Sequence, residues 1–313
     1  MIVGGRTYVR TMQQIRGRTF RQRRLAISYH LCRALESNGT QLRSRGQGPV
    51  AMTQYRNYSE PEFSARRHSA RDWAGWLREH EILHDFMPRP EEACAMCGGS
   101  KNAGYAKCWD CSHSFSGELD ALIAITYSFD RGLESLLHRY KDWGVDYRWI
   151  GKPLGALLSA AMVKHGACIR TFLGSEALFT WVPSNTPERG FDHIEHAVAS
   201  VNGFSTDYPW RSDLIARNWT ESKPSRKECK PEAYVVNGDV VNGRSILLVD
   251  DVYTSGASLV SASAAFKRAG ATKVVGLTIG RQLNPNYASG TNTALCGIAK
   301  ARDWSFDECA LCA

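Results

Sequence analysis

Two adjacent carboxylates, Asp250 and Asp251, follow four apolar residues at 246–249 that predict a buried parallel strand. A turn of small hydroxyl residues comes next, and an apolar-periodic helix is expected from Leu259 to Ala269, stopped by Gly270. In open α/β sheets, ligands bind just beyond the carboxyl ends of the strands. The acid pair therefore suits sugar hydroxyls or a divalent metal ion at that edge of the sheet.

The turn after the acid pair, Thr254-Ser-Gly-Ala-Ser258, is typical of an anion-binding cradle. Its small side chains leave backbone N–H groups free, and the helix that follows adds the positive end of its dipole. Gly256 lets the backbone approach an anion closely. Acids at one end and N–H groups at the other predict a site for a sugar phosphate.

A second set of chemistry-bearing residues is Cys94-Ala-Met-Cys97 and Cys108-Trp-Asp-Cys111. Two such pairs separated by a short loop are the ligand set of a four-cysteine zinc ribbon, a closed site without an open position for a catalytic water. A redox dithiol and a disulfide framework are the alternatives, and one dense cysteine cluster in a cytosolic-type chain argues against the framework. His113 lies close by, but the four cysteines already fill the shell.

Alternating strand and helix patterns surround these residues and must position them. This alternation predicts an α/β fold with a mostly parallel sheet and right-handed crossovers. In the first expected helix, Trp73 and Trp76 are assigned to packing rather than to base stacking. The strands are expected at 119–129, 178–182, 213–217, 246–249 and 273–279, and the helices at 69–86, 131–143, 150–165, 192–201 and 259–269.

The chain has 313 residues and a formal net charge of +8, and part of that excess lies in residues 1–51, which are rich in arginine and contain Glu36 as their only acid. Three interpretations compete. The segment is an arm that binds nucleic acid through phosphates, an organelle transit peptide, or an extension upstream of a natural start at Met52. No apolar run approaches the ~20 residues of a membrane span, and no signal peptide is visible, so a cytoplasmic location is expected.

Residues 246–258 resemble the thirteen-residue PRPP-binding signature of type I phosphoribosyltransferases at every position. The wider arrangement, over about residues 90–285, is similar to the ComF-type phosphoribosyltransferase-like family. It combines a four-cysteine ribbon, a strand with Lys141 on the helix after it, a Val182-Pro183 loop, Arg189-Gly-Phe and a basic loop ahead of the signature. The resemblance implies a type I phosphoribosyltransferase fold with structural Zn²⁺, PRPP as ligand, and pyrophosphate as a product.

In the terms of this resemblance, the 5′-phosphate of PRPP lies on the turn, and the acid pair binds ribose hydroxyls directly or through Mg²⁺. Bond cleavage at C1 passes through an oxocarbenium-like state, and basic side chains stabilise the departing pyrophosphate. The residues implied in catalysis are Asp250, Asp251, Arg189, Lys223 and Arg226. The residues implied in PRPP binding are Asp250, Asp251, Val252, Tyr253, Thr254, Ser255, Gly256, Ala257, Ser258, Pro183 and Ser184.

The sequence departs from the family at two places. The segment 183–189 is shorter than the usual pyrophosphate loop, and Thr254 stands where purine-salvage relatives carry a carboxylate. Two functions therefore stay open. One is an enzyme that transfers phosphoribose from PRPP to a nitrogen acceptor. The other is a catalytically silent PRPP- or nucleotide-sensing protein of the DNA-uptake type that binds single-stranded DNA through its basic segments.

Three further cysteines, Cys32, Cys168 and Cys229, are isolated and are interpreted as small hydrophobes or exposed thiols. Cys309 and Cys312 could bind zinc with Cys296 and a histidine, face a second chain in a homodimer, or belong to a frayed tail, which is the favoured interpretation. The expected organisation is a basic extension at 1–51, a linker and helix at 52–89, the ribbon at 90–118, the phosphoribosyltransferase-like domain at 119–285 and a tail at 286–313.

Overall fold

The computed structural model describes residues 56, 58–66, 68–86, 91–115, 117–129, 131–142, 144–187, 190–200, 208 and 210–312. The chain divides into two units, Met1–Gly48 and Pro49–Ala313. The basic segment 1–51, the alternative start at Met52 and Arg189 all lie outside the described residues. The sheet and the candidate sites lie in the second unit.

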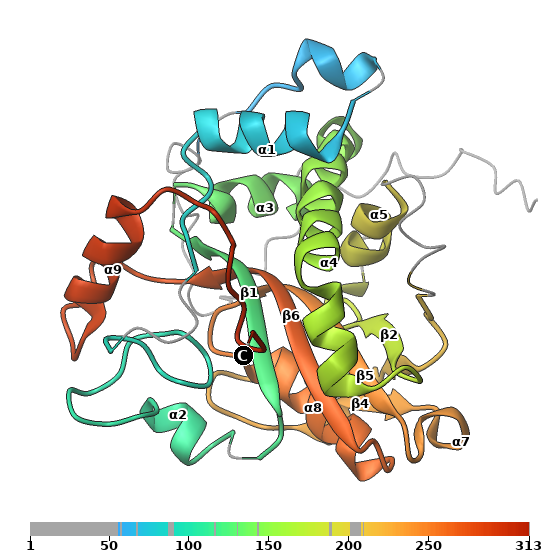
Figure 1. The fold of residues 1–313 in the computed structure, drawn as a ribbon. Helices are drawn as coiled ribbons and strands as arrows, with labels where there is room; N and C mark the ends of the chain where they lie inside the picture. The colour runs from blue at the N-terminus through green and yellow to red at the C-terminus, as the bar shows by residue number, and fades with distance from the viewer. Residues whose placement is uncertain are drawn as a thin grey trace, which may run out of the picture. The chain divides into compact units, whose positions relative to one another are not determined.

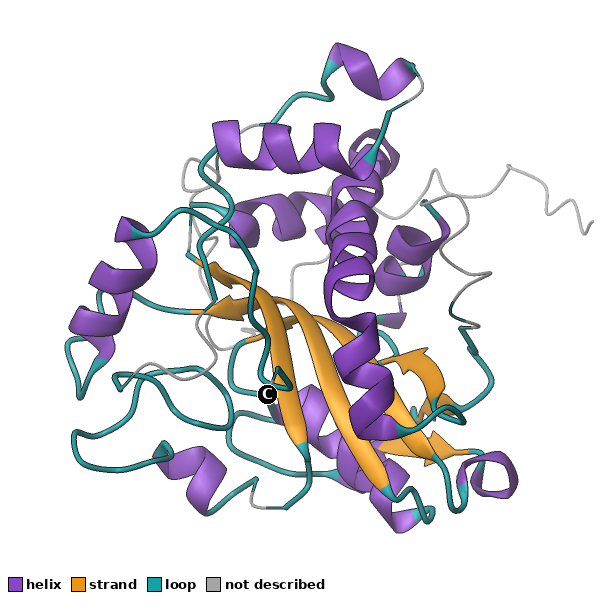
Figure 2. Ribbon diagram, viewed as in Figure 1, coloured by secondary structure: helices purple, strands orange, loops and turns teal. Residues whose placement is uncertain are grey.

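A four-stranded sheet forms the centre of this unit (Figures 1 and 2). Its strand order is β1 (Ala121–Ser128), β6 (Lys273–Gln282), β5 (Ser245–Tyr253) and β2 (Leu178–Trp181), and each neighbouring pair is parallel. Helices lie on both faces, which confirms the α/β prediction of a parallel sheet flanked by helices. The expected strand at 213–217 forms separately: β3 (Ile215–Arg217) pairs antiparallel with β4 (Tyr234–Val236).

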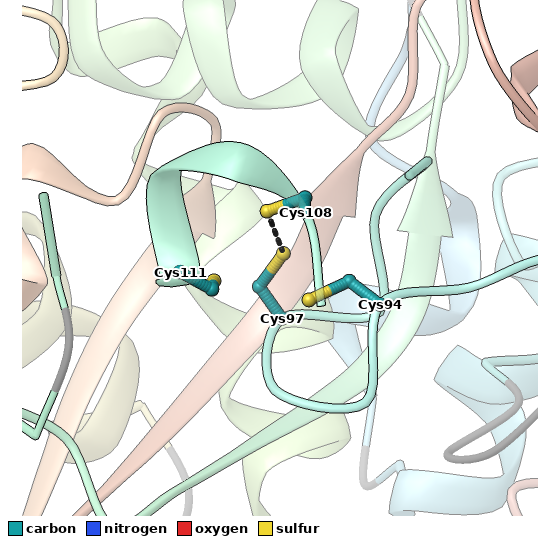
Figure 3. Close-up of side chains that lie close together, drawn as sticks. All are labelled: Cys94, Cys97, Cys108 and Cys111. Atoms are coloured by element: carbon teal, nitrogen blue, oxygen red, sulfur yellow. Dashed lines mark hydrogen bonds between the residues drawn. The ribbon is translucent and has the colours of Figure 1, made fainter. Parts of the chain in front are cut away.

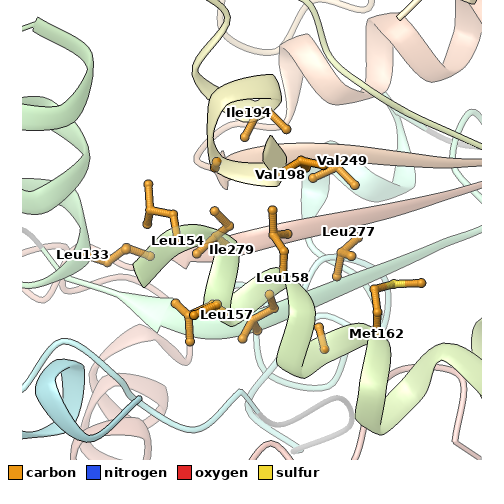
Figure 4. Close-up of a cluster of buried hydrophobic side chains, with 14 of the residues drawn as sticks. Leu133, Leu154, Leu157, Leu158, Met162, Ile194, Val198, Val249, Leu277 and Ile279 are labelled. Carbon is orange, nitrogen blue, oxygen red and sulfur yellow. The ribbon is translucent and has the colours of Figure 1, made fainter. Parts of the chain in front are cut away.

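Alternate residues of each strand point to opposite faces of the sheet. Both faces are buried, because each one packs in a core cluster. On β5, Leu247 and Val249 belong to one core cluster, and Ile246 and Leu248 belong to another. The first cluster contains side chains of α4 (Gly151–Leu173) and α5 (His193–Ala199), such as Leu158 and Ile194 (Figure 4). The second contains side chains of α8 (Ala257–Arg268) and three of the four ribbon cysteines. A strand buried on both faces needs a continuous apolar run, which is what made residues 246–249 recognisable.

The remaining elements have the following bounds. The helices are α1 (Ala70–Glu79), α2 (Trp109–Ser112), α3 (Leu133–Asp142), α4 (Gly151–Leu173), α5 (His193–Ala199), α7 (Gly238–Val241), α8 (Ala257–Arg268) and α9 (Asn292–Ala301). The 3₁₀ helices are η2 (Glu62–Ala65), η3 (Val145–Ile150) and η5 (Pro231–Ala233). None of the helices in the described part of the chain combines the length and apolarity that a bilayer crossing requires.

The helix expected at 69–86 ends earlier, at Glu79, because the chain turns at Glu81, whose φ of 55° lies outside the helical region. Asp85 then bridges to Thr126 of β1. The assignment of the tryptophans to packing is confirmed, since Trp73 and Trp76 are buried and Trp73 stacks on Trp149 at a centroid distance of 6.3 Å.

The end of the chain is packed, so the expectation of a frayed tail is wrong for residues 292–312. After α9, the chain runs back across the sheet (Figure 1) with the side chains of Trp304, Phe306 and Cys309 buried. Trp304 Nε1 donates to the Ile125 carbonyl at 2.8 Å, and the Phe306 N–H donates to Asp85 at 3.1 Å. Burial of two aromatic rings explains why this segment holds its place.

Candidate functional site

The acid pair lies where the sequence predicts it, at the carboxyl end of a central strand. Asp250 pairs with Thr278 of β6 in the parallel register, and β2 ends beside it at Trp181. Both side chains are almost fully buried, with exposed fractions of 9% for Asp250 and 5% for Asp251. They line a pocket of about 280 Å³. Two buried carboxylates at the wall of a pocket are costly unless a cation or a ligand compensates them.

Two cationic or titratable side chains that the site prediction did not include reach this acid pair. Lys141, in the last turn of α3, forms an ion pair with Asp251 Oδ2. His193, the first residue of α5, places Nε2 3.5 Å from the same oxygen. Both residues also line the pocket. His193 with Asp250 and Asp251 forms a group whose ligand atoms lie within 4.8 Å of one another, close enough to hold a metal ion.

The two carboxylates differ in their electrostatic surroundings. Burial raises the pKa of Asp250 to about 7, while Lys141 acts to lower this pKa and Asp192 acts to raise it. Asp251 forms an ion pair with the ammonium group of Lys141. Near neutral pH, the charge of Asp250 therefore depends on pH.

We expect ligand binding at this pocket to depend on pH through Asp250. Protonated Asp250 cannot accept a charge-assisted hydrogen bond. The affinity for a ribose phosphate should therefore reach its highest value above about pH 7, where Asp250 is ionised. Below that, the affinity should fall roughly tenfold per pH unit. Calorimetric titration with PRPP across the range tests this. The Asp250→Asn variant is the control, because its binding still depends on the titration of the ligand's phosphates but no longer on that of residue 250. Identical pH profiles for the variant and the parent would contradict the assignment.

The predicted anion cradle also forms. Gly256 has φ +85°, and a Cβ at this position would lie 2.2 Å from the Tyr253 ring, so the turn requires glycine. α8 begins at Ala257 without a side-chain cap at Gly256. The first residues of this helix, Ala257 to Leu259, line the pocket, so the positive end of the helix dipole lies at the pocket.

All of the predicted PRPP-binding residues share this one pocket. Pro183 and Ser184 enter it from the loop after β2, and Asn185 of the same loop donates from Nδ2 to Ser258 Oγ at 3.2 Å. Tyr253 also lines it, although this residue is only 4% exposed. The residues brought together are Lys141, Val182, Pro183, Ser184, Asn185, Thr186, His193, Asp250, Asp251, Val252, Tyr253, Thr254, Ser255, Gly256, Ala257, Ser258 and Leu259.

The predicted basic side chains are placed differently. Arg226 lines a neighbouring pocket of about 450 Å³ that also contains Thr254 and Ser255. Lys223 is exposed and lines neither this pocket nor that of the acid pair. The structure therefore brings Arg226 to the outer side of the cradle and does not bring Lys223 to the site.

The basic loop itself connects β3 to β4 and is fixed at its base. Arg217 is buried and donates to the backbone carbonyls of Asn218, of Ala233 at 2.5 Å and of Glu221 at 2.9 Å. The Lys230 N–H donates to Ser261 Oγ of α8 at 2.8 Å. An anchored base with an exposed tip is the form of a loop that can close over a ligand.

The four ribbon cysteines converge on one point (Figure 3). Their Sγ atoms all lie within 4.8 Å of one another, and Cys97 Sγ lies 3.8 Å from Cys108 Sγ. The Cys108 thiol beside it lowers the pKa of Cys97 to about 6, and Arg281 acts in the same direction. Four cysteine sulfurs this close together suit the tetrahedral coordination of structural zinc, so these four residues could hold a metal ion such as zinc.

Two local features shape this cluster. Gly98 has φ +64°, and a Cβ there would lie 2.4 Å from the Phe86 ring. The Cys94 N–H donates to the Gly99 carbonyl at 2.7 Å, which closes the first knuckle. His113 stacks on Trp109 at a centroid distance of 3.8 Å and is not among the converging ligands of this group.

Arg281, at the end of β6, connects the cysteine cluster to the cradle, and sequence reasoning missed it. Its Nε donates to the Cys97 carbonyl at 2.8 Å, and its guanidinium lies 3.6 Å from Cys97 Sγ. The same guanidinium donates to the carbonyls of Tyr253 at 3.0 Å and Thr254 at 3.1 Å. A metal bound by the cluster would therefore help to fix the first residues of the cradle.

Comparison of the chain with models of known protein families and with curated proteins found no match. What the structure establishes is an α/β protein with a four-stranded parallel sheet, helices on both faces, and a four-cysteine cluster able to hold a metal ion.

Proposed function

We propose that this chain is a PRPP-binding, phosphoribosyltransferase-like protein of the ComF type that transfers phosphoribose from PRPP to a nitrogen acceptor and releases pyrophosphate. One observation carries this proposal: the buried acid pair and the glycine-containing cradle at Thr254–Ser258 line the same pocket at the end of β5. Such a pocket can bind the hydroxyls of a ribose and its 5′-phosphate together.

The 5′-phosphate would bind at the cradle. The first backbone N–H groups of α8 and the positive end of its dipole attract a dianion, and Gly256 permits close approach. Arg226, on the tip of the β3–β4 loop, lines the outer side of Thr254 and Ser255. In this proposal, closure of the loop adds its positive charge to the phosphate groups and excludes water.

The ribose would bind at the acid pair. Asp250 and Asp251 accept hydrogen bonds from its hydroxyls, and Lys141 forms an ion pair with Asp251. The donor set of two carboxylates also fits Mg²⁺, which takes oxygen ligands and usually few from the protein. Asp250 and Asp251 are the residues that would hold the ion, and the ion would supply positive charge to the pyrophosphate of PRPP.

In the reaction, the bond between ribose C1 and the pyrophosphate oxygen breaks, and its electron pair leaves with pyrophosphate. The lone pair of the acceptor nitrogen forms the new bond to C1, and that nitrogen gives up its proton. Positive charge grows on the ribose as the first bond breaks, next to the carboxylates of Asp250 and Asp251. Fixed charges stabilise a transition state most where charge develops.

Isotope exchange tests catalysis. Labelled pyrophosphate is incubated with the protein, PRPP, Mg²⁺ and a panel of nitrogen bases, and the proposal expects label in PRPP with at least one base. The Asp250→Asn, Asp251→Asn double variant serves as the background. Exchange no faster than this background with every base, together with measurable PRPP binding, would point to a sensor rather than an enzyme.

A second candidate function, a nucleotide-sensing protein that binds single-stranded DNA, is favoured by a different observation. A pocket of about 800 Å³ lies beyond the end of β1, and it is rich in cationic side chains: Arg56, Arg78, Arg131, Lys300 and Arg302. Glu81 and Asp303 also line it, and the buried rings of Phe129 and Trp304 carry Lys300 and Arg78 over their faces. A groove rich in cations can follow the phosphates of a single strand without reading its sequence.

If the chain binds single-stranded DNA, the affinity should fall with salt at a log–log slope of about −0.7 per phosphate contact. Replacing Arg131 and Lys300 by alanine should then make the slope shallower by about 1.4 if both contact phosphates. Comparing full-length protein with protein starting at Met52 separates the pocket from the basic segment 1–51. Salt curves that coincide for all three proteins would exclude both as DNA-binding elements.

A further inference from the structure

A second group of side chains that could hold a metal ion, separate from the ribbon cysteines, lies where the segment after α9 meets α4. His165 and Cys168 are one helical turn apart on α4, and Cys309 and Cys312 lie in the segment that returns from α9 (Figure 1). Their four ligand atoms all lie within 4.8 Å of one another. His165 and Cys309 are buried, with exposed fractions of 3% and 1%.

The distances within this group are those of a tetrahedral zinc site. Zn–S bonds of about 2.3 Å and a Zn–N bond of about 2.0–2.1 Å place two sulfurs about 3.8 Å apart and a sulfur and a nitrogen about 3.6 Å apart. Cys312 Sγ lies 3.6 Å from Cys309 Sγ and 3.7 Å from Cys168 Sγ. Cys312 Sγ also lies 3.4 Å from His165 Nδ1. The Cys168 Sγ–His165 Nδ1 distance is 4.0 Å.

The surrounding hydrogen bonds orient these ligands. His165 Nε2 lies 2.9 Å from the Phe306 carbonyl, which can only accept, so the ring carries its proton on Nε2 and directs the Nδ1 lone pair at the thiols. A metal-bound histidine typically donates its other N–H in this way. The Cys309 N–H donates to Cys312 Sγ at 3.3 Å, and the Cys312 N–H donates to the Cys309 carbonyl at 3.0 Å. These bonds close the knuckle of a Cys-x-x-Cys pair.

We propose that His165, Cys168, Cys309 and Cys312 bind a structural zinc ion in a Cys₃His site. All four ligands, three cysteines and one histidine, come from the protein, so the site is closed, as structural zinc sites are. This proposal corrects the interpretation of Cys168 as an isolated thiol. It also replaces Cys296 as a partner of the C-terminal pair, because Cys296 lies on α9 in a separate apolar cluster.

The site would anchor the C-terminal segment to α4. Cys312 and Cys168 are 144 residues apart in sequence, and binding both to one ion fixes the last turn of the chain against the longest helix of the described residues. Lys164, next to His165, reinforces the contact through an ion pair with Asp307 at 2.7 Å. Trp304 and Phe306 between α9 and the site are then held over the core cluster that contains α4.

Metal analysis of the full-length protein, purified under reducing conditions without added zinc, tests the proposal. We expect two zinc ions per chain, one for each cluster. The variants Cys168→Ser and Cys312→Ser should each lose one ion and lower the melting temperature. Cys296→Ser is the matched control, because this buried cysteine lies outside both clusters, and it should keep two ions.

A cobalt titration distinguishes the two sites even if the Cys168→Ser and Cys312→Ser variants fold poorly. In a Cys94→Ser, Cys97→Ser protein, added Co²⁺ should still produce the visible absorption of one tetrahedral thiolate-bound ion. A parent protein with one zinc per chain and no tetrahedral cobalt spectrum in that variant would overturn the proposal. So would a disulfide between Cys168 and Cys312 that persists after purification under reducing conditions.

Discussion

Replacing Asp250 and Asp251 together by asparagine should weaken PRPP binding by about two to four decades. Each carboxylate can accept charge-assisted hydrogen bonds from ribose hydroxyls, worth about 1.5–3 kcal/mol each, and a neutral amide cannot replace them. Both side chains line the pocket. Calorimetric titration with PRPP and Mg²⁺ gives the affinities. Equal affinity for the double variant and the parent would contradict the assignment of the acid pair.

The weaker PRPP binding of these variants should not result from unfolding of the protein. The pKa of Asp250 is raised to about 7 by burial, so the folded state binds its proton more tightly than the unfolded chain does. Its ionisation therefore opposes folding as pH rises from about 4 towards 7 and above. We expect Asp250→Asn alone to keep or raise the melting temperature at pH 8 while weakening binding. Asp239→Asn, on exposed α7 outside the pocket, is the matched control and should change neither.

The second large effect concerns the metal of the four-cysteine cluster. Structural zinc binds zinc-finger peptides with roughly 10–16 kcal/mol, and that free energy is folding free energy. The double variant Cys94→Ser, Cys108→Ser should therefore lose one zinc ion per chain and unfold the segment around residues 91–115. Metal analysis and limited proteolysis provide the measurement, with new cleavage expected inside that segment.

The same variant should also weaken PRPP binding, because Arg281 connects Cys97 to the carbonyls of Tyr253 and Thr254. If the segment around Cys97 unfolds, the Arg281 guanidinium loses its hydrogen bond to the Cys97 carbonyl. Arg281 is then held less firmly against the carbonyls of Tyr253 and Thr254 at the start of the cradle. Cys229→Ser is the control, since this cysteine lies outside the cluster. A variant with the zinc content and protease pattern of the parent would show that the four thiols do not bind metal.

The parts of the site that the sequence predicts are those in which the ligand-binding atoms lie close together along the chain. Asp250, Asp251 and the cradle occupy nine consecutive residues, 250–258, and a strand, a turn and a helix fix their geometry locally. The ribbon cysteines are similarly local, since a tight knuckle positions each pair. Short-range geometry of this kind follows from residue type and spacing alone.

The parts that could not be predicted depend on tertiary packing. Lys141 and His193 reach Asp251 because α3 ends and α5 begins above the same strand end, and no local pattern marks that meeting. Arg281 and the His165–Cys312 pair depend on segments far apart in sequence. The sequence pattern did not predict α9, a short helix that contains Gly297. Glycine is less favourable than alanine inside a helix by about 1 kcal/mol, which weakens the helical signal.

The most direct test of the central claim is titration of the full-length, zinc-loaded protein with PRPP and with the two parts of that ligand. We expect one PRPP per chain in the presence of Mg²⁺, and competition by ribose 5-phosphate, which retains the groups that the cradle and the acid pair bind. Pyrophosphate alone should bind more weakly than PRPP. A folded protein that binds neither PRPP nor ribose 5-phosphate would contradict the account.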